Sequence, residues 1–466
     1  MSSSKTITTF CILALISSPA FAYDITDAIN ATLANNIQLK NSYISLQSAK
    51  LNRGAAAANF LPSIGVQTTT SRTYVDGMKA QVGTPSQNAL SVSEEIFSGG
   101  KGIYDLKSSK FSSEAAMIQY QDEIDRAIVQ TVQVYENVIA SRETYNVSQQ
   151  KVETLRKTVK QSEVKLAVGA ITRTNILEAQ AKLAGAISDR ERAYSDMRNA
   201  EEKFKYFTGD IAPKSMSDID ISSISFPKDH DTFLELVERN SPLITAAEKN
   251  LMATKYQTKS TKAMFLPTIT ASASVVGQSS WQRDIIGQTT KQHSDANTYQ
   301  LSFQIPIFQK GLEYVKVKKA LLDEETAANK KHDTILKIRQ DSALSWNNFS
   351  QSKISVDANT ESVNYYKAFA AGAEEEFNIG TKTLTDLLEA QLEYENARTQ
   401  LIQNKANMIV LGLQLKYLLG EIKNVDFSKL VLQDKTDTKN KMVKVEKKEK
   451  IPTDKIEKVS SISTEN

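Results

Sequence analysis

The chain contains two copies of one unit, and this duplication constrains its fold more than any local motif does. The segment FLPSI at 60–64 recurs as FLPTI at 265–269, an offset of 205 residues (60 to 265). Further along, NILEAQ at 175–180 recurs as DLLEAQ at 386–391, an offset of 211 residues (175 to 386). Two similar halves of this length predict one supersecondary unit used twice, so each copy helps to interpret the other.

The N-terminus predicts a segment that is removed on export. An apolar stretch at 10–16 follows Lys5 and precedes the small-residue motif AFA at 20–22, which is typical of a signal peptide at 1–22 cleaved after Ala22. The only cysteine, Cys11, lies inside this segment, so we expect no disulfide and no thiolate site in a mature chain that starts at Tyr23.

Each copy has the same predicted order of helix, strand, strand, long helix and shorter helix. We expect the first unit at 23–212, a linker at 213–228 and the second unit at 229–432. Because proline moves its predecessor out of the helical region, the first helix of each unit should end near Leu61 and Leu266. Residues 433–466 are rich in Lys and Glu with little apolar content, which predicts a disordered tail.

Four short strands are expected, at about 62–75, 89–97, 267–277 and 299–307. The last alternates most clearly, with Tyr299, Leu301, Phe303, Ile305 and Ile307 on one face and polar residues on the other. Nine residues is about the length with which a tilted strand crosses a bilayer. Beyond the N-terminal segment no apolar run reaches the roughly 18 residues of a membrane-spanning helix, so any membrane contact is expected from strands.

Two very long helices are predicted, from about Ile103 to Ala167 and from about Tyr314 to Asn378, where no proline interrupts the chain. At 1.5 Å per residue each would be roughly 90 Å long. The first carries a heptad-like seam with some polar members, among them Arg142, so it must pack laterally on neighbouring helices. The fold class is therefore mainly α with a small β part.

Composition argues against several classes of function. The formal net charge is only +3 and the basic residues form no stripe, so no nucleic acid is expected as a partner. The three histidines, His230, His293 and His332, have no second ligand at metal spacing, and no phosphate loop or serine elbow is present. The sequence predicts no metal, no cofactor and no enzymatic activity, so energy for any transport must come from partner proteins.

The duplicated order of landmarks resembles the TolC family of outer-membrane efflux and type I secretion channels. The matching landmarks are FLP before a strand, an aromatic residue and glycine turn after the second strand, Val/Ile-Gly before a threonine-rich turn, and a terminal Thr/Leu-Gly; they cover about residues 24–424. The resemblance implies a trimer in which coiled-coil helices form a periplasmic α-barrel and four membrane strands from each protomer complete a 12-stranded β-barrel. It also implies turn glycines at Gly99, Gly100, Gly169, Gly311 and Gly380.

A physical argument agrees with an oligomer. Four strands cannot close a barrel, and an open edge in lipid leaves backbone groups unpaired at several kcal/mol each. Eight strands fill their interior with side chains, whereas twelve leave a passage, which agrees with the implied trimer; more subunits are not excluded.

The resemblance places a gate at the periplasmic tip of the second unit. Asp386 and Glu389 lie three apart on one helix face, where acidic side chains from three subunits would form constricting rings and like-charge crowding would raise their pKa values. The alternative is structural, because Thr383 and Asp386 have capping-box spacing. On sequence grounds alone the polar caps of the equivalent first-unit turn favour that alternative, whereas the resemblance favours the gate.

The family's closed state is often latched by a tyrosine and an arginine that bond an aspartate. The matching positions here are Phe377, Lys382 and Asn175; Phe377 lacks a hydroxyl and Asn175 lacks a charge. We therefore expect a weaker or differently built gate, in which Lys382 bonds Asn175 or a backbone oxygen.

Aromatic side chains near the strand ends predict a belt at the membrane boundary. The candidates are Phe97, Tyr299, Phe303 and Phe308. The same alternation would serve the core of a soluble sandwich.

The resemblance thus implies a homotrimeric exit duct in the outer membrane of a Gram-negative bacterium, in contact with outer-membrane lipid and with helices projecting into the periplasm. It would serve a tripartite efflux pump or a type I secretion system. The resemblance implies a periplasmic adaptor (membrane fusion protein) and an inner-membrane ABC or proton-driven transporter as partners. The alternative is a soluble periplasmic coiled-coil adaptor or scaffold, which the alternation at 299–307 disfavours; a secreted hydrolase has almost nothing in its favour.

Overall fold

The computed structural model describes residues 23–71, 85–222, 224–283, 288–308 and 310–430. The predicted signal peptide at 1–22 and the predicted tail at 433–466 lie outside the described residues. So do positions 72–75 of the first predicted strand.

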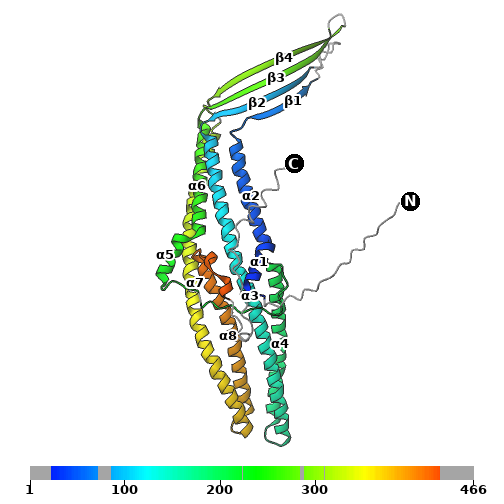
Figure 1. Cartoon of the computed structure of the whole chain (residues 1–466), viewed down its shortest axis with the longest axis vertical. Helices are drawn as coiled ribbons and strands as arrows, with labels where there is room; N and C mark the ends of the chain where they lie inside the picture. The colour runs from blue at the N-terminus through cyan, green and yellow to red at the C-terminus, as the bar shows by residue number, and fades with distance from the viewer. Residues whose placement is uncertain (1–22, 72–84, 223, 284–287, 309, 431–466) are drawn as a thin grey trace, which may run out of the picture. The chain divides into compact units, whose positions relative to one another are not determined.

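Two helical hairpins dominate the described chain (Figure 1). Helix α3 (Lys101–Ala167) has 67 residues and α7 (Leu312–Ile379) has 68. At 1.5 Å per residue each is about 100 Å long. Each returns through a short turn into an antiparallel helix of about half its length, α4 (Arg173–Thr208) or α8 (Leu384–Leu418). Among the described residues no helix is long and apolar enough to cross a membrane.

The other half of each long helix is covered by two shorter helices in place of the single one expected. These are α1 (Ile25–Asn35) and α2 (Ile37–Ala58) in the first unit, and α5 (His230–Asn240) and α6 (Pro242–Lys262) in the second. The first break occurs at Asn36, whose side chain caps α2 by accepting bonds from the amides of Gln38 and Leu39. Pro242 makes the second break, because it starts α6 at a position where no amide donor is required.

The strands form one antiparallel sheet of order β1-β2-β3-β4, with β1 and β4 at its edges. Strand β1 is Ser63–Thr70, β2 is Ser86–Ser98, β3 is Thr268–Arg283 and β4 is Thr289–Gln304. The central pair, β2 and β3, joins the two units, although these strands lie far apart in sequence. Both β1 and β3 start directly after the proline of a Phe-Leu-Pro segment, as predicted.

The strand boundaries correct the sequence prediction in two places. Strand β4 ends at Gln304, so Ile305 and Ile307 lie beyond it, and β4 begins ten residues earlier than expected, at Thr289. Strand β3 continues to Arg283, six residues past its predicted end. Polar residues carry these extensions, and their backbone pairing from Gly277 with Asp295 to Arg283 with Thr289 does not depend on an apolar face. The periodicity of apolar residues therefore underestimated the lengths of β3 and β4.

A bulge at Ile96 changes which side chains share a face. The register with β3 shifts between Glu95, opposite Thr270, and Phe97, opposite Ile269. Cross-strand partners point to the same face, so the bulge puts Phe97, and not Ile96, in line with Val92. Strict alternation along residues 89–97 would put Ile96 on that face instead. Glu94, opposite Ala271, remains on that otherwise apolar face.

The main core lies where α1, α3, α4, α8, the segment 212–222 and Ile224 meet. Tyr135 of α3 is completely buried there, and its hydroxyl donates to the carbonyls of Tyr23 and Ser217 at 3.1 and 2.7 Å. A second core fills the hairpins near their turns, and a third joins α5 to α7 and the end of α8. The mainly helical, duplicated fold expected from the sequence is confirmed.

Candidate functional site

The turns that close the two hairpins form the candidate gate. Gly169 follows the end of α3 with φ of +74°, and Gly380 ends α7 with φ of +85°. A side chain is disfavoured at such angles, so glycine permits the reversal of the chain. Positive φ values also occur at the other predicted turn glycines, Gly99, Gly100 and Gly311.

Asp386 makes the capping contacts that the structural alternative predicted. Its carboxylate accepts bonds from the Thr383 amide at 3.0 Å and the Thr383 hydroxyl at 2.7 Å, while its own amide donates to that hydroxyl at 3.2 Å. The hydrogen bonds from Thr383 lower the pKa of Asp386 in the protomer, opposite to the direction expected from crowding of acids. Glu389 is exposed one turn further along α8.

Lys382 and Asn175 do not pair with each other, contrary to the prediction. The Lys382 amine lies 3.2 Å from a Glu376 carboxylate oxygen and 4.6 Å from the centre of the Phe369 ring. Asn175 is engaged within its own turn, where its Oδ1 accepts from the Thr172 amide and hydroxyl at 3.1 and 2.6 Å. Asn175 stands in the capping box of α4, whereas Lys382 directly precedes Thr383, the N-cap of α8. Each side chain therefore contacts a partner within its own hairpin.

Phe377 is buried, with only 2% of its surface exposed, and Lys165 of α3 reaches it. The Lys165 ammonium stands 3.7 Å from the ring centre and also donates a hydrogen bond to the Phe377 carbonyl. This bond gives the Phe377 carbonyl a second donor besides the Gly380 amide, and it joins the first hairpin to the second. The sequence reading missed Lys165; its place in the last turn of α3, where a cation is favoured, was the available signal.

A second contact joins the hairpins through their shorter helices. The Thr385 hydroxyl of α8 donates to the Glu178 carboxylate of α4 at 2.9 Å. We call Lys165, Phe377, Glu178 and Thr385 the tip clasp, because these four residues connect the two hairpins near their turns. Of the three positions expected to form the latch, only Phe377 belongs to the tip clasp; Lys382 and Asn175 do not.

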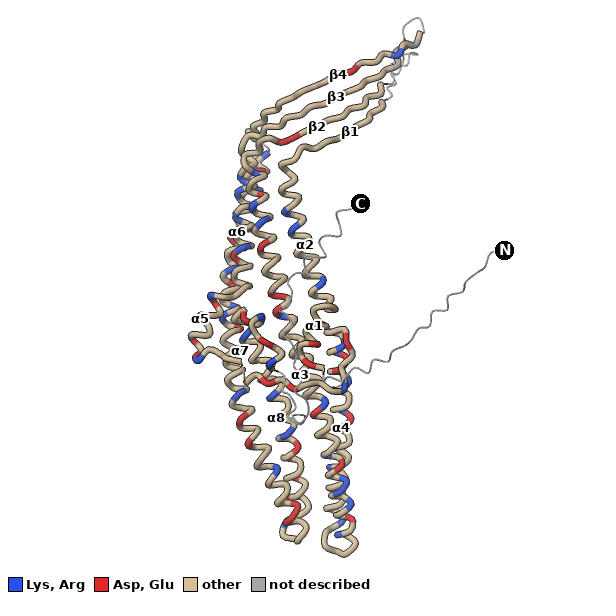
Figure 2. The backbone as a smooth tube through the Cα atoms, in the orientation of Figure 1, with Lys and Arg blue, Asp and Glu red and all other residues tan. Residues whose placement is uncertain are grey.

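The two tips differ in charge (Figure 2). Between 151 and 182 the first hairpin carries seven Lys or Arg and three Glu, whereas the equivalent 362–393 of the second carries two Lys and six Asp or Glu. Glu374, Glu375 and Glu376 are exposed near the C-terminal end of α7, where the helix dipole disfavours negative charge. Acidic residues that oppose local helix stability are more readily explained by function than by folding.

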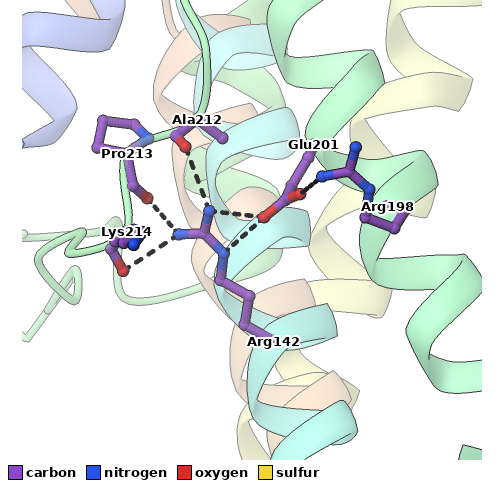
Figure 3. Close-up of polar contacts among 6 residues, drawn as sticks. All are labelled: Arg142, Arg198, Glu201, Ala212, Pro213 and Lys214. Atoms are coloured by element: carbon purple, nitrogen blue, oxygen red, sulfur yellow. Dashed lines mark hydrogen bonds and ion pairs between the residues drawn. The ribbon is translucent and has the colours of Figure 1, made fainter.

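Arg142 ties the linker to the first hairpin (Figure 3). Its guanidinium contacts Glu201 of α4, with Nη2 2.7 Å and Nε 3.1 Å from the same carboxylate oxygen. It also donates to the backbone carbonyls of Ala212, Pro213 and Lys214. Arg142, a polar member of the predicted seam, therefore holds the irregular segment at 212–214 as well as packing between helices.

The predicted belt aromatics are exposed but do not lie at one level. Phe97 and Phe303 flank Ile269 at the end of the sheet next to the helices, and Phe308 follows β4 in the connection to α7. Tyr299 lies four residues further along β4 from Phe303, which is about 13 Å at the strand rise. Three of the four residues thus mark one boundary of the sheet.

In the described part of the chain no three His, Cys, Asp or Glu side chains come together as a metal site.

Comparison with known proteins identifies the fold. The family model described as "Outer membrane efflux protein" matches residues 28–209 and 233–421, in two segments that follow the duplication. The chain is 24% identical over 405 residues to "Outer membrane protein TolC" of Escherichia coli, which covers 84% of this chain and 81% of that protein. It is 22% identical over 428 residues to "Outer membrane efflux protein BepC" of Brucella suis, covering 91% of each.

Solved structures agree. The chain superposes with a TM-score of 0.73 on the CmeC outer membrane channel of Campylobacter jejuni, with 21% identity over 87% of this chain and 88% of that one. The TM-score with CusC is 0.75, with 15% identity over 85% of this chain and 91% of that one. These findings do not support the soluble adaptor alternative. The chain belongs to the outer membrane efflux protein family.

Proposed function

We propose that the protein is the outer-membrane exit duct of an efflux or type I secretion assembly, conducting substrates passively from the periplasmic side to the exterior. One observation carries the proposal: an antiparallel sheet of four strands has two open edges, β1 and β4, and apolar side chains exposed on one face. In lipid such a sheet is stable only if copies of the chain pair edge to edge.

Three copies would supply twelve strands, enough to surround a passage, and the paired hairpins would continue it as a helical tube. The protein then acts as a homotrimer in the outer membrane, after export of the chain by its N-terminal segment. A periplasmic adaptor and an energised inner-membrane ABC or proton-driven transporter would deliver the substrate.

The hairpin tips form the gate, and the tip clasp holds each protomer closed. Opening would separate the second hairpin from the first, which requires breaking the Lys165 contacts to Phe377 and the Thr385 bond to Glu178. Each contact is modest, at roughly 1 kcal/mol, so a docked partner can supply the energy. Asp386, Glu389 and the three glutamates at 374–376 would line the constriction and favour cations.

Planar bilayers test the duct. The purified trimer should insert and show stepwise conductance, and a protein that stays monomeric in solution without detergent would contradict the proposal.

Lys165→Met combined with Glu178→Ala should raise the fraction of time that the channel spends open. The matched control is Lys157→Met, because Lys157 is exposed on α3 and, among the described residues, forms an ion pair only with Glu153. Equal conductance in all three proteins would remove the clasp from the gate.

Reversal potentials under a salt gradient test the acidic constriction. Asp386→Asn with Glu389→Gln removes two charges per protomer, while the amide oxygen at position 386 can still accept a hydrogen bond from the amide of Thr383, the N-cap of α8. The ratio of cation to anion permeability should fall. An unchanged ratio would show that these carboxylates lie away from the passage.

A further inference from the structure

Positive charge is concentrated where the helices meet the sheet. The four segments nearest the strands are 46–58 of α2, 101–114 of α3, 250–262 of α6 and 310–322 at the start of α7. Together they carry twelve Lys or Arg and three acidic residues, although the whole chain has 57 basic and 54 acidic residues. Figure 2 shows blue positions on α2 and α6 close to the strands. We call these twelve residues the basic collar: Lys50, Arg53, Lys101, Lys107, Lys110, Lys255, Lys259, Lys262, Lys310, Lys316, Lys318 and Lys319.

Most of this charge is not neutralised within the protomer. All twelve side chains are exposed. Lys101 pairs with Asp105 at 3.2 Å and Lys110 lies 4.0 Å from Glu114, while the other ten form no ion pair with a described carboxylate. Like charges this close repel one another, so an anionic surface beside them would be favourable.

Part of the collar is organised around an aromatic pair. Lys255, Lys259 and Lys262 follow the spacing that puts residues on one face of α6. The amines of Lys259 and Lys107 lie 4.9 and 5.4 Å from the centre of the Tyr256 ring, and that ring stacks on Phe111 at 5.6 Å. The α6 lysine patch, made of Lys107, Lys255, Lys259 and Lys262, is therefore a continuous surface shared by α3 and α6.

The position of the patch relative to the sheet points to its ligand. Helix α6 ends at Lys262 and β3 starts at Thr268. Exposed apolar side chains occupy the level between them, including Leu61, Phe265 and Leu266. From the sheet towards the helices, apolar strand residues come first, aromatic and aliphatic residues second, and lysines last. This is the order expected for a protein that crosses a lipid surface bearing negative charge.

We propose that the basic collar, through the α6 lysine patch, binds the phosphate groups of anionic phospholipids in the leaflet on the helix side of the membrane. This rests on the proposed function, because it requires the sheet to enter a bilayer. Lysine stems can lie along the apolar boundary while their ammonium groups reach the headgroups. The collar then sets how deep the sheet sits, since burial of the lysines in hydrocarbon is unfavourable.

The test is lipid selection around the reconstituted trimer. Spin-labelled phosphatidylglycerol and phosphatidylcholine are compared in proteoliposomes by the fraction of each lipid whose motion the protein restricts. At low salt the wild type should prefer phosphatidylglycerol, by about fivefold if one lysine acts per lipid. Changing all four patch lysines to glutamine should bring the ratio close to one, and changing them to arginine should preserve it.

The matched control removes the same number of charges far from the sheet, by glutamine at Lys203, Lys330, Lys337 and Lys353, which are all exposed. It should keep the wild-type ratio. An equal loss in both variants would indicate a general effect of net charge and overturn the proposal. A patch variant that keeps the wild-type lipid preference but alters anion permeation would place the lysines in the passage instead.

Conductance in neutral lipid distinguishes a failure of the lipid-binding collar from a failure of the duct itself. The patch variant should insert and conduct like the wild type, because neither the strands nor the tips are changed. A wild type that conducts but selects no anionic lipid refutes the collar alone. A wild type that neither inserts nor conducts refutes the duct and the collar together.

Discussion

Glu136 should make the stability of the helical core depend on pH. This side chain of α3 is 4% exposed, and its Oε1 has no hydrogen-bond partner in the described residues. Burial raises its pKa to about 8, with smaller contributions from the carboxylates of Asp218 and Glu143. Because the pKa is raised in the folded state, the unfolded chain releases this proton more readily, and folding becomes less favourable as pH increases.

The magnitude follows from the two pKa values. The pKa of Glu136 rises from its ordinary value of 4.5 to about 8 in the folded protein. Each pKa unit corresponds to about 1.4 kcal/mol, so the unfolding free energy should fall by about 3 kcal/mol between pH 4 and 7 and by about 4 kcal/mol at pH 8. Replacing Glu136 with glutamine keeps the size of the side chain and removes this contribution. The variant should match the wild type at pH 4 and exceed its stability at pH 8.

Guanidinium unfolding of the detergent-solubilised protein, followed by helical circular dichroism at pH 4 to 8, measures the effect. Other buried carboxylates titrate in both proteins, so the difference between wild type and variant is the informative quantity. Glu163→Gln is the control, because Glu163 is exposed on the same helix. If wild type and Glu136→Gln curves stay parallel over the whole range, Glu136 is not buried as a neutral acid and the reasoning fails.

Replacing Arg142 with methionine should lower the unfolding free energy by about 2 to 4 kcal/mol, because Oε1 of Glu201 and the carbonyls at 212–214 lose a donor, although Arg198 still pairs with Oε2 of Glu201. Proteolysis in that segment should accelerate, and unchanged rates would contradict the anchoring role of Arg142. Gly99→Ala should impair trimer formation, since a Cβ there would lie 2.4 Å from the Leu266 Cβ at a φ of +64°; heat-resistant trimer on gels reports the outcome, and normal yield would be the contrary result. Gly380→Ala should lower the unfolding free energy by about 1 kcal/mol, because of the positive φ at this position alone. Gly185→Ala should raise it by up to about 1 kcal/mol, because Gly185 lies within α4 and a Cβ there would meet open space. The melting temperatures of the two variants should therefore shift in opposite directions.

The features that depend on local chemistry were predictable from the sequence. Pro62 and Pro267 mark the entry to the sheet, and Gly380 marks the end of a long helix, because each restricts or permits particular backbone angles. The capping pair Thr383 and Asp386 was likewise anticipated from its spacing.

Features that depend on packing between distant segments were not predictable in this way. The bulge at Ile96 exists only relative to β3, and the contact of Lys165 with Phe377 joins residues from different hairpins. Nothing in the local sequence of either residue specifies its partner. The helix break at Asn36, by contrast, has a local signal, because asparagine is a favoured N-cap residue. Good helix formers on both sides of Asn36 hid this signal.

The hairpin architecture makes the reach of the protein adjustable in fixed steps. Because α3 with α4 and α7 with α8 meet at simple glycine turns, seven residues added to every leg would move both turns outward by about 10 Å and keep the side-chain register of the packed helices. The sheet, the Arg142 anchor and the turns themselves would keep their own contacts. The length of such a chain can change by whole heptads while both of its ends keep their structure.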